Sequence, residues 1–150
     1  QFTKNPDAMN TRMLLASLAA GVASFFIGWF VWGVLLMDYY EASMNQFEGL
    51  NKAPEDMNML AMVLANLMWG LLVGWSIWRM GITTAMQGAM AGAMLFALVA
   101  LSMSLYYVAM TNMYSDNTII VVDLVVNAVV GGILGAIAAL VLGKGQKAAA

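Results

Sequence analysis

The sequence contains no cysteine and no histidine in its 150 residues. The absence of cysteine excludes disulfides and thiolate nucleophiles, and the absence of both residue types excludes the common zinc sites and histidine-ligated haem. Without histidine, the chain also lacks the usual general base near neutral pH. We therefore expect neither a metal nor another cofactor.

Charged residues are scarce as well, at 9% of the chain, whereas apolar residues make up 63%. Ordinary globular proteins carry about 25% charged and about 45–50% apolar residues. A soluble fold of this size cannot cover so much apolar surface with so few charges. Lipid is therefore the expected solvent.

The groups that membrane enzymes need are missing too. Only one acid lies inside an apolar stretch, so a pair of carboxylates sharing a site is excluded there. No histidine or intramembrane lysine is present to activate a serine or to form a retinal Schiff base. The sequence also lacks a phosphate-binding loop motif and a basic cluster for nucleic acid. We predict that the chain is not an enzyme and binds no nucleic acid.

Four stretches are long enough to cross a membrane, which takes roughly 20 apolar residues per helix. They are residues 13–37, 57–78, 82–113 and 118–143, with residues 38–56 forming an outer loop. Their apolar character is continuous, which favours helices over the alternating pattern of barrel strands. The first stretch is too long for a signal peptide and is expected to be a retained span. We predict an all-α fold with a single transmembrane domain over residues 1–150, arranged as a four-helix bundle.

The charges divide unevenly between the two ends of these spans. One side carries Lys4, Arg12, Arg79, Lys144 and Lys147 with the single acid Asp7. The other side carries only one base and seven acids: Lys52, Asp38, Glu41, Glu48, Glu55, Asp56, Asp116 and Asp123. Basic residues accumulate on the cytoplasmic side of membrane proteins. Both termini are therefore predicted to be cytoplasmic.

The outer loop contains two further local signals. Tyr40, Met44 and Phe47 follow a helical spacing, which predicts a short helix lying on the outer membrane surface. Pro54, Glu55 and Asp56 suit the first turn of a helix, so they are expected to begin the second span.

Small residues recur every fourth position on the spans, which places them on one face of each helix. In lipid, such faces let neighbouring backbones approach closely. The predicted packing residues are Gly70, Gly74, Gly88, Gly92, Gly131, Gly135 and Ala139. They fit either packing within one bundle or a seam between two copies.

Polar residues inside the spans define a candidate pocket. Asp123 and Asn127 lie on the fourth span, and others reach a similar depth on the remaining spans: Asn66, Ser102, Ser104 and Trp29. If all four faces turn inward, they form an outward-facing pocket with an acid at its mouth. Alternatively, the neutral residues simply hydrogen-bond across helices.

The fifteen methionines also allow two readings. Thioethers bind Cu(I), and several methionines lie near the acidic outer end. Methionine is equally an adaptable filler of apolar cores, and neither cysteine nor histidine accompanies it here. We favour packing, and predict no metal site.

Residues 21–40 (GVASFFIGWFVWGVLLMDYY) and 122–143 (VDLVVNAVVGGILGAIAALVLG) suggest a family. They resemble the first and last helices of small bacterial four-span membrane proteins of unassigned function. The resemblance implies a four-helix fold in the bacterial inner membrane but no activity. The chain does not resemble small multidrug exporters, since its first span contains no acid, or tryptophan-rich sensory proteins.

Two classes of function follow. The first is a non-catalytic structural or accessory subunit, which packs in membrane lipid with itself or with another membrane protein. The second is a small transporter or solute- or cation-binding protein built around the polar pocket. The first class requires fewer assumptions, so we favour it.

Overall fold

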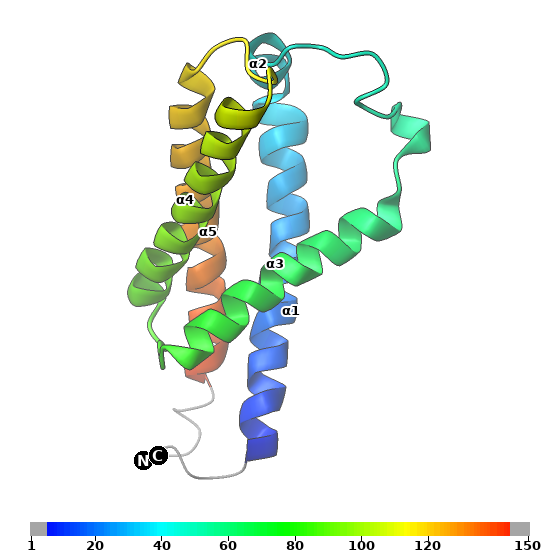
Figure 1. Ribbon diagram of the computed structural model, residues 1–150. Coiled ribbons are helices and arrows are strands. Elements are labelled where there is room, and N and C mark those ends of the chain that lie inside the picture. Colours follow the sequence, from blue (N-terminus) through cyan, green and yellow to red (C-terminus); the bar gives the residue numbers. More distant parts are fainter. Residues whose placement is uncertain (1–5, 145–150) are drawn as a thin grey trace.

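The computed structural model describes residues 6–144 and is built from helices, with one long loop near one end (Figure 1). In chain order the helices are α1 (Pro6–Phe30), a π-helical segment (Val31–Leu35), α2 (Met37–Ser43), a 3-10 turn (Pro54–Asp56), α3 (Met59–Arg79), α4 (Ala85–Met110) and α5 (Thr118–Lys144). Four segments are long and apolar enough to cross a membrane: Thr11–Leu35, Met59–Arg79, Ala85–Met110 and Thr118–Lys144. The prediction of an all-α chain with four such helices is confirmed.

Helices α4 and α5 lie side by side and pack through glycine (Figure 1). A methyl group on Gly92 would overlap the carbonyl oxygen of Gly131, and one on Gly135 would overlap that of Gly88. The two backbones are therefore too close for any side chain at these positions. Such close approach maximises van der Waals contact between helices, which replaces the hydrophobic drive that is absent in lipid.

Helices α1 and α3 make a second contact of the same kind, although α3 crosses α1 diagonally (Figure 1). A methyl group on Gly70 would overlap the backbone of Ser17 and Gly21, and one on Gly74 would overlap the side chain of Ser17. Beyond this crossing, every residue of α3 from Met59 to Ala65 is exposed.

The two pairs meet in one small core. Its buried side chains come from α1, α3, α4 and α5: Ala16, Ala20, Val73, Ile77, Phe96, Val130, Leu134, Ala138, Ala139 and Leu142. A direct contact between α3 and α4 is the ring pair of Trp69 and Phe96, with centroids 5.0 Å apart. Most large apolar side chains outside this core face outward, as lipid-covered surfaces do.

We call the end of the molecule that carries α2 the outer end. There α2 is joined to residues 111–117, the connection between α4 and α5. The Ser115 amide donates to the Ser43 carbonyl (3.0 Å), and the Asn45 amide donates to the Met113 carbonyl (2.8 Å). We refer to α2 and residues 111–117 together as the outer cap.

Two predicted helix boundaries are wrong. The short outer helix ends at Ser43 and does not reach Phe47, because Met44 is extended and pairs with Tyr114 in an isolated β-bridge. Residues 54–56 form a separate 3-10 turn instead of beginning the second span. Helix α3 begins at Met59, where the side chain of Asn58 accepts a hydrogen bond from the Ala61 amide (3.0 Å). That bond satisfies one of the free amides at a helix start.

Candidate functional site

A polar cluster lies at the outer end, around the carboxylate of Asp123 on α5. Its Oδ1 accepts hydrogen bonds from the Tyr40 hydroxyl (2.6 Å) and the Asn127 side-chain amide (3.1 Å). Its Oδ2 accepts a longer bond from the Ser104 hydroxyl (3.3 Å). All three donors are uncharged, so hydrogen bonding and not a counter-cation stabilises the carboxylate.

Three parts of the chain bring these groups together. Asn127 follows Asp123 by one helical turn and also donates to the Asp123 carbonyl oxygen (2.8 Å). Ser104 comes from α4 and is only 1% exposed. Tyr40 comes from α2, which lies over the ends of α4 and α5. The Tyr40 bond falls in the short range typical of hydroxyl–carboxylate pairs, about 2.5–2.7 Å, and is the strongest contact of the cluster.

Two tyrosines of the outer cap, Tyr40 and Tyr114, have a raised pKa. Burial raises the pKa of the Tyr40 hydroxyl well above its usual range, the hydrogen bond to Asp123 adds to the rise, and the side chain of Trp32 opposes it. Burial likewise raises the pKa of Tyr114, which the neighbouring Ser104 hydroxyl lowers and the charge of Asp123 raises. Both phenols therefore stay protonated near neutral pH, so Tyr40 remains a donor.

The remaining predicted pocket residues lie elsewhere. The amide oxygen of Asn66 accepts from the Ser24 hydroxyl (2.8 Å), and its nitrogen donates to the Met62 carbonyl (2.9 Å). Ser102 is exposed, and Trp29 is 62% exposed. The structure thus brings together Asp123, Asn127 and Ser104 but not Asn66, Ser102 or Trp29. Asn66 links α1 to α3, as the alternative reading of the neutral residues expects.

Sequence reasoning missed one member of the cluster, Tyr40, which it assigns to a surface helix. Of the two tryptophans that bracket the polar level on the first span, Trp32 and not Trp29 lies beside Tyr40. The helical spacing of the outer loop does place Tyr40 on the face directed at the membrane. That spacing indicates that the Tyr40 hydroxyl points toward the membrane-spanning helices. No residue pattern in the sequence indicates the π-helical segment that carries Trp32.

The predicted packing residues all lie inside the molecule. Gly70 and Gly74 are buried against α1, and the others are buried between α4 and α5: Gly88, Gly92, Gly131, Gly135 and Ala139. Their close-packing surfaces are occupied by this chain's own helices. A partner would have to use a different surface.

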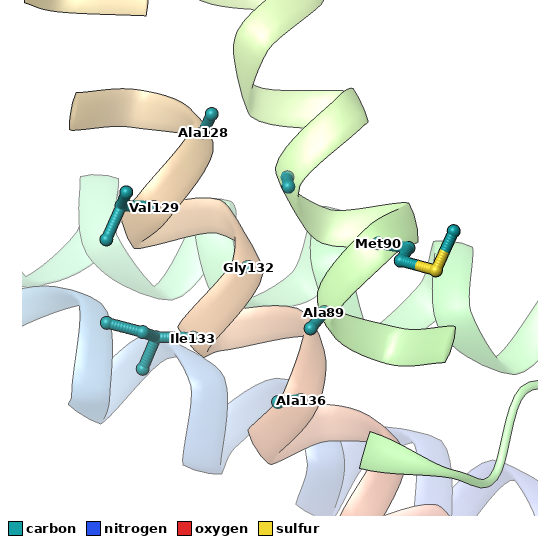
Figure 2. A pocket seen from close by; sticks show the side chains of 8 residues that line it. Ala89, Met90, Ala128, Val129, Gly132, Ile133 and Ala136 are labelled. Atoms are coloured by element: carbon teal, nitrogen blue, oxygen red, sulfur yellow. The ribbon is translucent and has the colours of Figure 1, made fainter. Parts of the chain in front are cut away.

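Such a surface is present on the opposite side of the α4–α5 pair, as a shallow apolar groove (Figure 2). We call it the α4–α5 groove; it is lined by Ala89, Met90, Ala93, Ala128, Val129, Gly132, Ile133 and Ala136. Four of these residues are alanine and one is glycine, so their small side chains leave a depression between the two helices. A methyl group on Gly132 would lie 3.4 Å from the Ala89 carbonyl oxygen and 3.6 Å from the Ala93 methyl, which is ordinary contact. Internal packing therefore does not require glycine at position 132.

The cluster offers limited chemistry. Asp123 has no second carboxylate among its hydrogen-bond partners, and those partners are weak acids or amides. Within residues 6–144, no group of three or more acidic, histidine or cysteine side chains is placed to hold a metal ion. The arrangement can orient α2, and it can present a carboxylate to a small polar species.

Comparisons with known proteins leave the family open. No family model matches the chain, and neither a curated protein nor a solved structure shows significant similarity to it.

Proposed function

We propose that this chain is a non-catalytic multi-pass membrane protein, a structural or accessory subunit that self-associates along the α4–α5 groove. The observation that supports this most directly is the groove itself. Small residues at four-residue spacing line it on both helices, although the neighbouring glycine seam, one residue away along α5, already holds the pair together. Small residues that are not needed inside the molecule provide close approach for a helix from outside.

The surface beside the groove suits a second copy. Met86, Met90 and Met94 follow one another at four-residue spacing on α4 and are 72%, 68% and 67% exposed. They form a ridge next to the groove. A twofold interface needs a surface that is complementary to itself, and a ridge beside a groove provides both parts. Methionine adapts its shape readily, which favours such packing.

The membrane orientation belongs to the same proposal. The first turns of α1 and the last turns of α3 and α5 lie toward the end of the molecule opposite the outer cap (Figure 1). These turns carry Arg12, Arg79 and Lys144, whereas the cap carries Asp38, Glu41 and Asp116. Lys4 and Lys147 are outside the described residues. The excess of basic residues at one end supports cytoplasmic termini. The resemblance of the first and last spans supports the inner membrane of a bacterium.

Disulfide cross-linking tests the self-association, since the chain has no cysteine of its own. Ala136→Cys places one thiol in the groove, and mild oxidation in native membranes should yield a cross-linked dimer. Adding Gly132→Leu fills the groove and should lower the dimer yield at least tenfold. Leu18→Phe adds bulk on the exposed surface of α1 and should leave the yield unchanged. A dimer yield insensitive to Gly132→Leu, or no dimer at all, contradicts the proposal.

A second candidate function is supported by the polar cluster: binding of a small cation or polar solute at Asp123. An acidic side chain inside a span is a candidate functional group, and the hydrogen-bond donors to Asp123 are all neutral. Sodium is the first probe, measured by calorimetry on the purified protein in detergent. Binding that is present in the unsubstituted protein and in Ser102→Ala, but absent in Asp123→Asn, supports this candidate. No heat of binding in the unsubstituted protein rejects sodium as the ligand.

A further inference from the structure

The connection between α1 and α2 has the geometry of a hinge. Helix α1 runs into the π-helical segment Val31–Leu35, in which the Leu36 amide donates to the Val31 carbonyl (2.9 Å). Leu36 then leaves the helical conformation, with φ −114° and ψ 7°, and α2 begins at Met37. The chain turns here, so that α2 lies across the outer end of the molecule (Figure 1). π-Helical turns occur frequently at functional sites.

One strong contact holds α2 onto the membrane-spanning helices below it. The Tyr40 hydroxyl reaches down to Asp123 and forms the 2.6 Å bond with its carboxylate. Its neighbour Tyr39 makes a longer contact with the Thr118 hydroxyl (3.3 Å), which is exposed. Of these two adjacent tyrosines, only Tyr40 binds a carboxyl group, and its bond is part-buried.

The other contacts join α2 and the residues just after it to residues 111–117. Two are the backbone bonds from Ser115 to Ser43 and from Asn45 to Met113. Two more are made by side chains at exposed positions: Ser115 Oγ donates to the Ala42 carbonyl (3.3 Å) and Asn45 Nδ2 donates to the Asn112 carbonyl (2.7 Å). Water can replace an exposed hydrogen bond at little cost, so exposed bonds contribute less to holding α2 in place. A part-buried bond is replaced less readily. The Tyr40–Asp123 bond is therefore the strongest contact between α2 and the membrane-spanning helices, whereas the backbone bonds of Ser43 and Asn45 join α2 to residues 111–117.

The groups beneath α2 are polar, and Asp123 and Asn127 among them are half-buried. Ser104 is almost fully buried, and Asn127 lies one turn deeper than Asp123 on α5. If α2 turned away, these side chains would face the outer solution. The exposed surface of α2 carries Asp38 and Glu41, so the approach to the site is acidic.

We propose that α2 is a lid, held closed over Asp123, Ser104 and Asn127 by the Tyr40–Asp123 hydrogen bond, and that it opens outward by turning about Leu36. The lid controls access of water and small cations to the carboxylate. This inference does not depend on self-association along the α4–α5 groove.

Cysteine accessibility tests the lid. Ser104→Cys places a thiol beneath α2 and removes the longest bond of the cluster together with the contact to Tyr114. A membrane-impermeant cationic thiol reagent should modify it slowly in the otherwise unsubstituted chain. Adding Tyr40→Phe should raise the rate roughly ten- to a hundredfold, the factor expected for losing a hydrogen bond to a charged group. Tyr39→Phe is the matched control and should leave the rate unchanged.

A reporter at Leu50→Cys, in the exposed outer loop, gives the rate of an uncovered thiol. If Ser104→Cys reacts as fast as Leu50→Cys before any tyrosine is changed, the site is not covered and the proposal fails. Equal Ser104→Cys modification rates with Tyr40→Phe and with Tyr39→Phe also overturn the proposal, since the Tyr40–Asp123 hydrogen bond then does not hold the lid closed.

Hydrogen exchange on the unsubstituted protein provides a test that needs no variant. Amides of α2 should exchange through local opening, much faster than those of the seam between α4 and α5. Equal protection of α2 and of that seam contradicts a moving lid. Asp123→Asn provides a further test by keeping an acceptor without the charge, so its Ser104→Cys rate should fall between the unsubstituted and Tyr40→Phe rates. A rate equal to the unsubstituted one overturns the role of the carboxylate.

Discussion

Gly131 and Gly132 are neighbours in α5, yet they face different surroundings. A methyl group on Gly131 would overlap the Gly92 carbonyl oxygen, whereas one on Gly132 would meet its nearest atom at 3.4 Å. Gly131 lies in the seam, which is closed by the chain's own α4, whereas Gly132 lines the open groove beside it. Glycine at the seam is required by the fold. Glycine in the groove is not, which is why we connect it with association.

The largest effect is expected when one methyl group is added to the seam, where the structure leaves no room for it. Gly135→Ala would place a methyl against the Gly88 backbone, which cannot move as a flexible side chain can. We expect the free energy of unfolding in detergent to fall by about 3 kcal/mol, the upper range for overpacking a core. Loss of thermal stability, followed by the helical circular dichroism signal, measures it. A change below about 0.5 kcal/mol, the usual range of surface substitutions, would show that the seam is looser than the structure has it.

The seam between α1 and α3 allows the comparison to be extended to a polar contact. Asn66→Leu removes the acceptor of the Ser24 hydroxyl and leaves that hydroxyl, at a buried position, without its partner. Hydrogen bonds between membrane helices contribute about 0.6 kcal/mol on average and up to roughly 1.7 kcal/mol. We expect a loss of about 1 kcal/mol, clearly smaller than that of Gly135→Ala. The double variant with Ser24→Ala should lose no more than Asn66→Leu alone, because the two groups act as one contact.

The sequence was sufficient for the parts of the fold that depend on composition and periodicity. The four spans follow from uninterrupted apolar stretches, and the glycines at four-residue spacing do lie on packed faces. Their partners were not predictable, because Gly92 against Gly131 depends on how α4 is rotated and shifted along α5. Sequence spacing fixes which residues share a face but not which face meets which.

The same limit explains the polar cluster. Asp123 and Asn127 belong together by spacing alone, and Ser104 joins them through the α4–α5 pairing. Asn66 was expected at the same level, but α3 crosses α1 diagonally and brings it to Ser24 instead. Tyr40 depends on a turn at Leu36 that follows a π-helical segment, and no residue pattern signals that turn.

The buried phenols of the outer cap can be tested by titration at high pH. The pKa of Tyr40 and that of Tyr114 are both raised in the folded protein, chiefly by burial. A raised pKa means that the folded state favours the protonated phenol. Its stabilising contribution is therefore complete below the unfolded value, about 10, and is lost as the pH rises above it.

We accordingly expect Tyr40 and Tyr114 to ionise late when the absorbance of phenolate is followed to high pH. Tyr40→Phe should remove one late-titrating group. The stability that these two phenols contribute to the outer cap should be lost only at high pH. Late titration that persists unchanged in Tyr40→Phe would contradict the buried position of this hydroxyl.

The smallest effect should come from the groove side of α5, and it is the most informative. Gly132→Ala adds a methyl group that fits between Ala89 and Ala93, so the monomer should lose no stability. Alanine is favoured over glycine in a helix by roughly 0.5–1 kcal/mol, so a slight gain is expected in detergent. The same methyl raises the groove floor and should weaken association in membranes, measured as the yield of the Ala136→Cys dimer. Stability and association then change in opposite directions at one residue, which a glycine needed only for folding cannot produce.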